Sequence, residues 1–469
     1  MLRIKPLHLV LAALLCGPLA FSTASVAAAG KPSAARYRVV DLGSLGGDFG
    51  ILQGRSINLA GAAVGFMGTN VPDPFNPDCF FDCNVDHAFL YQGGKTYDLG
   101  ALAKGVSSLA AGITNAGLVY GQAQNGKLDP LTGFPQARAV QWIDRQIVNL
   151  GTLGGNQSIA IMANPQGQTI GGALTSRLDP FADQPMAGCR YTPISGAGAN
   201  WSTFAENSFF APGATETHAT LWWGGTKYDM DTLGGPDSMA VDVNVVGQAV
   251  GWSYTSFQAN DFGVPDVRPF VWNLRTRKMR DLGSLGGACA IAAAINNRGE
   301  VVGHSTLANN TTEHPFLWTA MGGMRDLGSL GGDFAHANAI NDRGEVIGYS
   351  TMVPRGQGQP PTYAKGRAFY WKNGTMTNLG TFGDDYSDAN SINSPGQIVG
   401  EIFSPTTGAS LIGWISDRGG PIVDLNTLID PASGYQIIAA GHITDAGEIG
   451  ARAIAPDGTE HPVKLVPIR

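Results

Sequence analysis

Residues 281–325 read DLGSLGGACAIAAAINNRGEVVGHSTLANNTTEHPFLWTAMGGMR, and the same order of short motifs recurs along the chain. The opening motif returns, complete or varied, at seven other positions: Asp41, Asp98, Asn149, Asp229, Asp326, Asn378 and Asp424. Eight copies in one chain indicate a repeat array rather than two or three unrelated domains.

Each unit contains a turn of the form Asn-x-x-Gly, as in Asn296 to Gly299 and Asn341 to Gly344, with Thr in place of Asn in two units. Asn first and Gly fourth favour a type I turn that closes a hairpin, because the Asn side chain accepts a backbone N–H and Gly adopts a positive φ. A second Gly follows on the next short strand, at a similar distance from the turn in each unit. With the His-Ala-Phe-Leu-Trp strand and a final short strand, each unit is predicted to form four antiparallel strands.

Two columns of the repeat differ in side-chain size. Four residues before the turn every unit has Gly or Ala, whereas the third strand carries a bulky apolar residue such as Trp318. Near the axis of a radial array only small side chains fit, and bulky ones fill the wider space between diverging sheets. We therefore predict an all-β fold, a β-propeller of eight four-stranded blades. Seven blades is the alternative if the divergent last unit does not form a full sheet, and a β-solenoid fits this taper less well.

The two ends of the array complete one another. Residues 37–40 correspond only to the last strand of a unit, and the chain ends after residues 461–465, which correspond to the third. Pairing the N-terminal strand with the C-terminal blade would remove the exposed edges of an open array. We predict a propeller closed in this way.

The array resembles the HAF-repeat family of predicted extracellular bacterial repeat proteins. The residues that carry the resemblance are the triplet His87-Ala88-Phe89, its relatives around His314, the Asp-Leu-Gly-x-Leu-Gly-Gly motif and the Ile-Asn-x-x-Gly turn. The resemblance spans nearly the whole mature chain. It implies export and a repeat fold, and it implies no activity and no catalytic residues.

The first 29 residues have a basic start, an apolar run and small residues before Gly30, the pattern of a secretory signal peptide. We expect residues 30–469 to form a single propeller domain, exported to the periplasm or the extracellular space. The chain carries 30 Lys and Arg against 37 Asp and Glu. Without a basic cluster or a later long apolar run, we expect no nucleic-acid partner and no membrane insertion. We expect a monomer.

The units differ mainly in the connection between the second and third strands. The longest insertion, at about 172–217, contains aromatic residues among Pro, Gly and Ser. We expect these insertions on one rim, where repeat proteins often bind. The aromatics either pack as a lid or form a platform for a glycan or a peptide. The candidate ligand-binding residues are Tyr191, Trp201, Phe204, Phe209 and Phe210.

Four cysteines follow the leader, an even number for an exported chain. Cys79 and Cys83 flank three residues in the first insertion, so a short disulfide is the simplest prediction. Cys189 and Cys289 either pair or stay free. Zinc has too few ligands here, and Asp73, Asp78, Asp82 and Asp86 match no calcium loop, so we expect no metal site.

Catalytic motifs are missing from the repeat. His87, His314 and two further histidines share a column with arginines, which favours a structural hydrogen bond to the Asp or Asn that opens each Asp-Leu-Gly motif, such as Asp281. The non-repeating polar residues at His304, Asp384 and Asp385 are the first places to look for chemistry. We expect a secreted, non-catalytic binding or interaction scaffold without a cofactor. The alternative is a polysaccharide- or peptide-acting enzyme with an active site assembled at the channel.

Overall fold

The computed structural model describes residues 36–52, 54–76, 83–182, 214–354, 366–383, 386–404 and 407–468. The chain separates into residues 1–34 and residues 35–469, and all the described residues belong to the second of these parts. Their regular structure is β-strand, apart from the short 3-10 helices η2 (Leu425–Thr427) and η3 (Pro431–Ser433). In these ranges we find no helix that is long and apolar enough to cross a membrane.

The strands follow the predicted order, four to a repeat unit. The first strands are β2 (Gly50–Ile51), β6 (Ser108–Ile113), β10 (Gly154–Ala163), β14 (Ser238–Val243), β18 (Gly286–Ile295), β22 (Ala335–Ile340), β26 (Tyr386–Ile392) and β30 (Gln436–Ile443). The second strands are β3 (Ala63–Pro72), β7 (Val119–Leu128), β11 (Thr169–Leu178), β15 (Gln248–Tyr254), β19 (Val301–Leu307), β23 (Val346–Thr351), β27 (Gln397–Phe403) and β31 (Ile449–Ile454).

The outer half of each unit is equally regular. The third strands are β4 (Asn84–Gln92), β8 (Pro135–Ile143), β12 (Thr215–Trp223), β16 (Val267–Asn273), β20 (Glu313–Thr319), β24 (Gly366–Lys372), β28 (Ser410–Asp417) and β32 (Glu460–Pro467). The fourth strands are β1 (Tyr37–Asp41), β5 (Lys95–Asp98), β9 (Gln146–Asn149), β13 (Thr226–Asp229), β17 (Lys278–Asp281), β21 (Gly323–Asp326), β25 (Thr375–Gly380) and β29 (Val423–Asp424).

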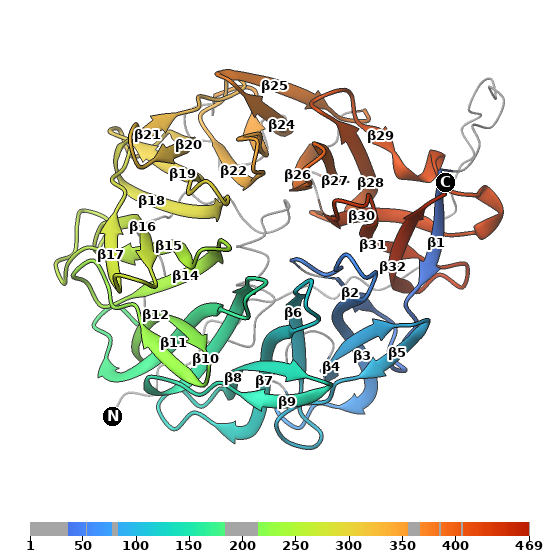
Figure 1. The fold of residues 1–469 in the computed structure, drawn as a ribbon, viewed down its shortest axis with the longest axis horizontal. Coiled ribbons are helices and arrows are strands. Elements are labelled where there is room, and N and C mark those ends of the chain that lie inside the picture. Colours follow the sequence, from blue (N-terminus) through green and yellow to red (C-terminus); the bar gives the residue numbers. More distant parts are fainter. Residues whose placement is uncertain are drawn as a thin grey trace. The chain divides into compact units, whose positions relative to one another are not determined.

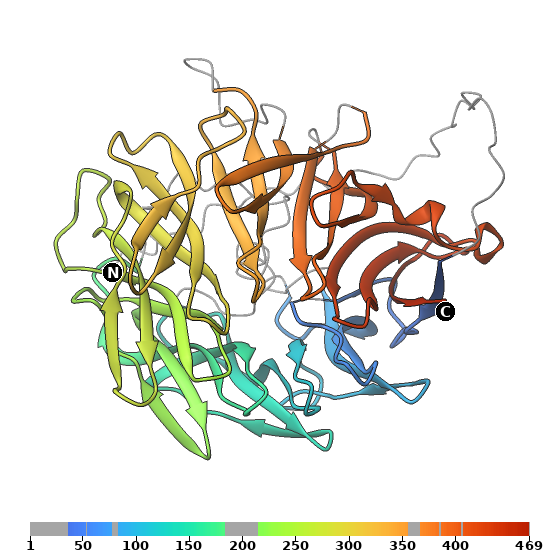
Figure 2. The same cartoon turned by 45° about the horizontal axis from the view of Figure 1, so that its top comes forward.

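These strands form six four-stranded sheets and one eight-stranded sheet. The larger sheet contains β14–β17 and β18–β21, joined by one parallel pair between Val267 and Cys289. Figures 1 and 2 show the sheets following one another around a common centre, with first strands innermost and fourth strands outermost. The described part of the chain is thus all-β and propeller-like, built from four-stranded antiparallel groups.

One sheet joins the two ends of the described chain. β1 pairs antiparallel with β32, from Tyr37 opposite Pro467 to Asp41 opposite Val463. The sheet order is β1-β32-β31-β30. Asp41 also accepts hydrogen bonds from Tyr435 and His461 at 2.7 and 2.8 Å, so side chains reinforce the backbone pairing.

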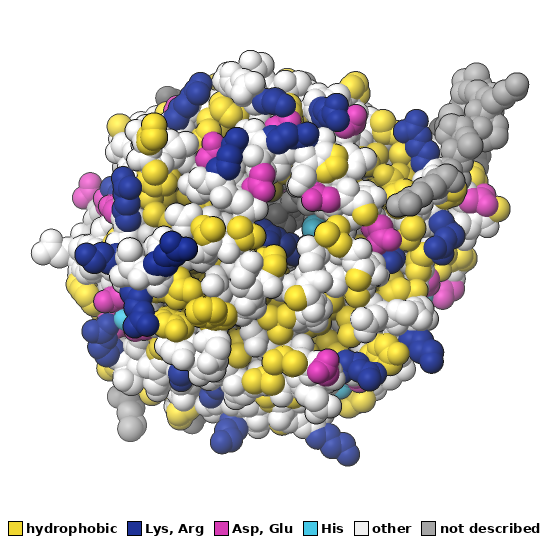
Figure 3. Space-filling view, viewed as in Figure 1, with side chains coloured by type: hydrophobic (Ala, Val, Ile, Leu, Met, Phe, Trp, Pro, Cys, Tyr) yellow, Lys and Arg dark blue, Asp and Glu magenta, His cyan; other side chains and the backbone are white. Residues whose placement is uncertain are grey.

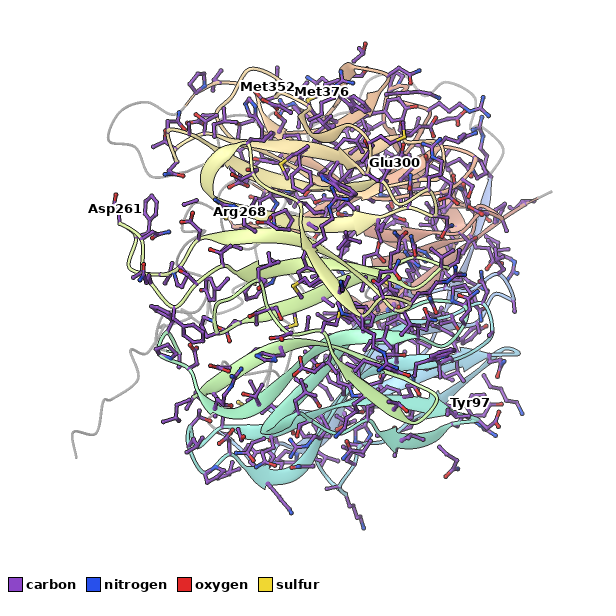
Figure 4. All side chains as sticks on the ribbon, turned by 60° about the vertical axis from the view of Figure 1, so that its left-hand side comes forward. Tyr97, Asp261, Arg268, Glu300, Met352 and Met376 are labelled. Carbon is purple, nitrogen blue, oxygen red and sulfur yellow. The ribbon has the colours of Figure 1, made fainter. Side chains whose placement is uncertain are left out.

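The Asn-x-x-Gly turns have the predicted geometry. Gly299 donates its N–H to the Asn296 carbonyl at 3.0 Å and has φ +76°. The Asn296 side-chain oxygen accepts the N–H groups of Arg298 and Glu300, each at 3.0 Å. Its Nδ2 donates to Glu300, labelled in Figure 4, at 2.6 Å. The side chain therefore stabilises its own hairpin through both of its polar atoms.

The same asparagines also connect neighbouring sheets. Asn296 Nδ2 donates to the Asn341 carbonyl, in the next unit, at 3.1 Å. Equivalent bonds of 2.9 to 3.2 Å run from Asn58, Asn164, Asn244, Asn341 and Asn393. Thr114 and Thr444 have no side-chain amide that could donate such a bond. The turn column thus holds the array together as well as closing hairpins.

The second Gly column is explained by a bulge in the first strand. The β18–β19 register shifts between Ala292 and Ala294, and a Cβ on Gly303 would lie 2.0 Å from the Ile291 carbonyl oxygen. The same approach, 2.0 Å to the Ile159 oxygen, occurs at Gly171. Only glycine fits where the neighbouring backbone comes so close.

The size columns pack between the sheets as predicted. The small residue of the first strand, such as Ala292, and the bulky residue of the third, such as Trp318, are both buried. Together with Val301 and Phe316 they belong to one apolar cluster that includes residues of adjacent sheets. Burial of these aromatic side chains against neighbouring sheets supplies much of the apolar contact.

The connection between β11 and β12 is shorter than the expected insertion at about 172–217, because both strands extend into it. β11 continues to Leu178, which pairs with Thr215 at the start of β12 after a register shift. The strands extend because their backbones keep pairing beyond the repeat motif. The connection therefore begins at residue 179 and ends at residue 214.

Candidate functional site

A cavity of about 710 Å³ lies at the centre of the sheets, lined by first strands and by their Asn-x-x-Gly turns. This volume falls within the range of about 300 to 1,000 Å³ that is usual for pockets holding small ligands. The face seen in Figure 3 is hollowed near its centre. The lining residues come from many units, so the pocket is a property of the assembled array.

One part of the lining is apolar. Ala111, Ile161 and Val241 follow the small inner residue of β6, β10 and β14, and all three line the cavity. We call these three residues the apolar wall. Figure 1 places β6 and β10 across the centre from β22 and β26.

The same columns become polar in other units. Asn338 of β22 and Asn390 of β26 stand where the apolar wall has Ala, Ile and Val. His336 and Asp388 precede the small residue of the same two strands, where β6, β10, β14 and β18 have Leu, Ile, Met and Ile. These substitutions gather on adjacent first strands.

The polar wall comprises His304, Glu313, His336, Asn338 and Asn390, all of which line the cavity. Asp388 lies behind it and is fully buried. His304 Nε2 lies 3.8 Å from Glu313 Oε1, and His336 Nε2 lies 3.9 Å from Asp388 Oδ2. Each imidazole is therefore backed by a carboxyl group at a distance longer than a hydrogen bond.

Neighbouring groups fix the orientation of the wall. Asn338 Nδ2 donates to Asp388 Oδ1 at 3.0 Å and to the Ala389 carbonyl at 2.9 Å. The His336 ring stacks on Tyr349 at a centroid distance of 5.5 Å and an interplanar angle of 21°. The His304 and His336 ring centroids are 6.3 Å apart. These contacts position the two imidazoles side by side.

Burial shifts the pKa values of the two histidines of the polar wall and of Asp388 behind it. It lowers the pKa of His304 to about 4, and burial and then His304 lower the pKa of His336 to about 3. Burial, followed by repulsion from Glu401, raises the pKa of Asp388 well above its usual value. Both imidazoles are thus neutral at pH 7, and the shift at Asp388 disfavours the ionised form of its carboxyl group.

An ion pair spans units 1 and 4 at the pocket. Arg55 Nη2 lies 3.3 Å from Asp242 Oδ1, and Asp242 also accepts the N–H groups of Val243 and Ile295 at 2.8 and 2.9 Å. The Arg55 side chain is 46% exposed. Among the described lining residues it is the only Lys or Arg.

The histidine column has the structural role that the sequence predicts. Nδ1 of His87 lies 2.9 Å from Asp98, Nδ1 of His314 lies 2.9 Å from Asp326, and His461 contacts Asp41. Each carboxylate belongs to the Asp that opens an Asp-Leu-Gly motif.

Arg268 and Arg138 of this column behave differently, so the prediction is wrong for these two arginines. Arg268, labelled in Figure 4, bonds to Asp266 at 3.1 Å and to the Ala288 carbonyl at 3.2 Å rather than to Asp281. Arg138 bonds to Gln136 and to the Asn156 carbonyl. The guanidinium is longer than an imidazole and reaches past the opening residue to other acceptors. Asp281 Oδ1 instead accepts the Gly283 N–H at 2.7 Å.

Several predicted site residues lie outside the described residues. These are the aromatic candidates Tyr191, Trp201, Phe204, Phe209 and Phe210, the acidic residues Asp78, Asp82, Asp384 and Asp385, and Cys79 and Cys189. Cys83 and Cys289 are each disulfide-bonded, which removes the alternative of a free Cys289. In the ranges that can be described, no group of three His, Cys, Asp or Glu side chains is arranged to hold a metal ion.

Sequence reasoning pointed to His304 but missed the rest of the polar wall. The available signal was the departure of single units from an otherwise apolar column, as at His336, Asn338 and Asp388. The search for recurring motifs passes over such departures, because they occur once or twice in eight units.

The fold and the pocket define a propeller-like, all-β protein with a central cavity. No protein-family model and no curated protein matches the sequence. Among solved structures, the chain is similar to the acylaminoacyl peptidase of Pyrococcus horikoshii, with 10% identity and a TM-score of 0.41, covering 86% of this chain and 57% of the peptidase. The chain thus spans little more than half of that protein.

Two further similar structures are covered over most of their length. TolB from Acinetobacter baumannii has 10% identity and a TM-score of 0.31, with 75% of this chain and 80% of that chain covered. An oligogalacturonate lyase from Vibrio parahaemolyticus has 9% identity and a TM-score of 0.36, with 94% and 98% covered. Similarities this distant assign no activity to the chain.

Proposed function

We propose that the protein is an exported, non-catalytic binding scaffold whose ligand, a glycan or a peptide, enters the central pocket. The observation that supports this proposal is that polar residues which do not recur in the repeat are concentrated on one side of that pocket. His304, His336 and Asn338 replace residues that are mostly apolar in the other units. A polar group buried at a position where the fold accepts an apolar one costs stability, which a ligand contact can justify.

We further propose that the scaffold is an eight-bladed propeller closed by β1. The four-strand groups, two of them within the eight-stranded sheet, support this blade count. The pairing of β1 with β32 supports closure between the ends. The histidine–aspartate contacts of His87 and His314 support membership of the HAF-repeat family, since they give the histidine of the His-Ala-Phe strand a structural role in both units.

A binding and turnover screen tests the function. The mature protein, residues 30–469, is applied to arrays of glycans and peptides and is incubated with the polysaccharides that bind. Binding without product release is the expected result. Absence of binding to every class would contradict the proposal.

An enzyme is the second candidate, favoured by one observation. Two imidazoles backed by carboxyl groups, His304 by Glu313 and His336 by Asp388, resemble in outline the oriented acid–base groups of hydrolytic sites. Appearance of new reducing or unsaturated ends in the same screen, lost in a His304→Leu variant, would favour this candidate over the scaffold.

A further inference from the structure

The polar wall has hydrogen-bonding capacity that the protein itself does not use. His304 Nε2, His336 Nε2 and Asp388 Oδ2 are buried and have no hydrogen-bond partner among the described residues. Leaving a buried polar atom unpaired costs about 1 to 3 kcal/mol. Two of these atoms belong to His304 and His336, whose rings line the cavity, and Asp388 lies behind them. The unused hydrogen-bonding capacity needs an explanation, and a ligand that reaches the exposed parts of the two rings provides one.

The groups of this wall can both donate and accept. A neutral imidazole carries one N–H donor and one acceptor nitrogen. His304 and His336 keep 16% and 13% of their side-chain surfaces exposed while lining the cavity. Hydroxyl groups have the same dual character, so a ligand rich in hydroxyls matches this wall better than one with only acceptors.

Charge in the pocket disfavours an anionic ligand. Arg55 is already paired with Asp242, and Glu313 and Asp242 both line the cavity. An anion would have to displace Asp242 from Arg55 or approach these carboxyl groups without compensation. An uncharged ligand meets neither cost.

The apolar wall complements the polar one. Ala111, Ile161 and Val241 present only methyl and methylene groups. The C–H faces of a sugar ring pack against such groups, while the ring's hydroxyls point outward from its edge. A ligand with one apolar face and a polar edge satisfies both sides of the cavity.

We propose that the central pocket binds an uncharged oligosaccharide, with its hydroxyls bonded to His304 and His336 and its ring faces on the apolar wall. This inference rests on the proposed function and narrows its ligand class. Residues of the polar wall then determine specificity, and the repeated residues of the sheets hold them in place.

The test measures affinity by calorimetry for neutral gluco-, xylo- and manno-oligosaccharides, oligogalacturonates and neutral peptides. We expect binding of at least one neutral oligosaccharide. His304→Leu and His336→Leu should each weaken it about fivefold or more, the loss of roughly one hydrogen bond. His336→Gln, which keeps a donor and an acceptor, should remain within about twofold.

His314→Leu is the matched control, because His314 bonds to Asp326 and does not line the pocket. It should leave affinity unchanged, and thermal melting shows whether each variant is folded. Unchanged affinity in the folded His304→Leu and His336→Leu variants overturns the inference. Binding only of oligogalacturonates or only of peptides also overturns it, while the proposed function stands. Failure of all three classes removes both.

Discussion

The polar wall and the apolar wall use the same backbone for different purposes. His336, Asn338 and Asn390 of the polar wall lie on first strands with a bulge, as does the whole apolar wall. His304 and Glu313 lie on a second and a third strand. The bulged strands pack against a glycine whose added Cβ would lie 2.0 Å from a carbonyl oxygen, at Gly303 beside His304 and at Gly171 near Ile161. On the first strands the two walls differ in the side chains directed to the cavity. The comparison teaches that single substitutions can create a site in this array without altering the sheets.

The largest expected effect tests whether the two walls share one scaffold. Gly303→Ala and Gly171→Ala should each lower the free energy of unfolding by about 3 kcal/mol, because the new Cβ meets a backbone oxygen that cannot move independently. Urea unfolding measures both. The control is Gly93→Ala, where φ is +61° and nothing lies within 4 Å, so that only about 1 kcal/mol is lost. A loss at Gly303 no greater than at Gly93 contradicts the shared bulge.

A smaller effect is a pH dependence of the free energy of unfolding, which we expect on the side of the polar wall and not on the side of the apolar wall. Because burial raises the pKa of Asp388, its contribution to stability is complete below about pH 4 and is lost as pH rises through the folded-state pKa. Asp388→Asn keeps an oxygen for the Ala389 N–H, bonded at 2.7 Å, and cannot ionise. Relative to the wild type, the variant should gain stability as the pH rises from 3.5, where the Asp388 carboxyl is protonated in both the folded and the unfolded chain, to pH 8.

Unfolding curves at the two pH values check this expectation. Ile159→Val, on the apolar side at the column position equivalent to Asp388, should show a difference from the wild type that is independent of pH. A variant Asp388→Asn that is less stable than the wild type at pH 8 would mean that the carboxylate is ionised and stabilising.

The smallest effect concerns the link between units 2 and 3. Thr114 has no amide, whereas Asn296 donates to the next unit at 3.1 Å. Thr114→Asn should add this bond and raise the free energy of unfolding by about 0.5 to 1 kcal/mol, while Asn296→Thr should lower it by about 1 kcal/mol. Thermal melting of both variants checks the pair. No gain at residue 114 would show that the adjacent carbonyl there is placed differently.

The repeated chemistry could be read from the sequence, because each recurring residue has a local physical reason. Asn296 and Gly299 define a turn, and the pairing of His314 with Asp326 follows from their fixed positions in the unit. The polar wall could not be assembled in the same way. His304 and His336 lie on different sheets, and their proximity depends on the rotation between units, which no local motif records.

The Arg268 contacts show a related limit. A column that alternates His with Arg indicates a shared donor role, but side-chain length decides which acceptor is reached. Arg268 therefore bonds to Asp266 and to a backbone carbonyl instead of the opening Asp of its unit. Chemical similarity within a column predicts the type of interaction better than the partner.

The pairing of β1 with β32 has a consequence for the order in which the molecule folds. Tyr37 and Asp41 pair with Pro467 and Val463, so this sheet joins residues separated by nearly the whole chain. During synthesis β1 has no partner until β32 has been made. Such distant contacts form slowly, because a long loop must close first. We therefore expect every incomplete chain on the ribosome to carry an unpaired β1. Its free edge can pair with other molecules until the C-terminal strands have been synthesised.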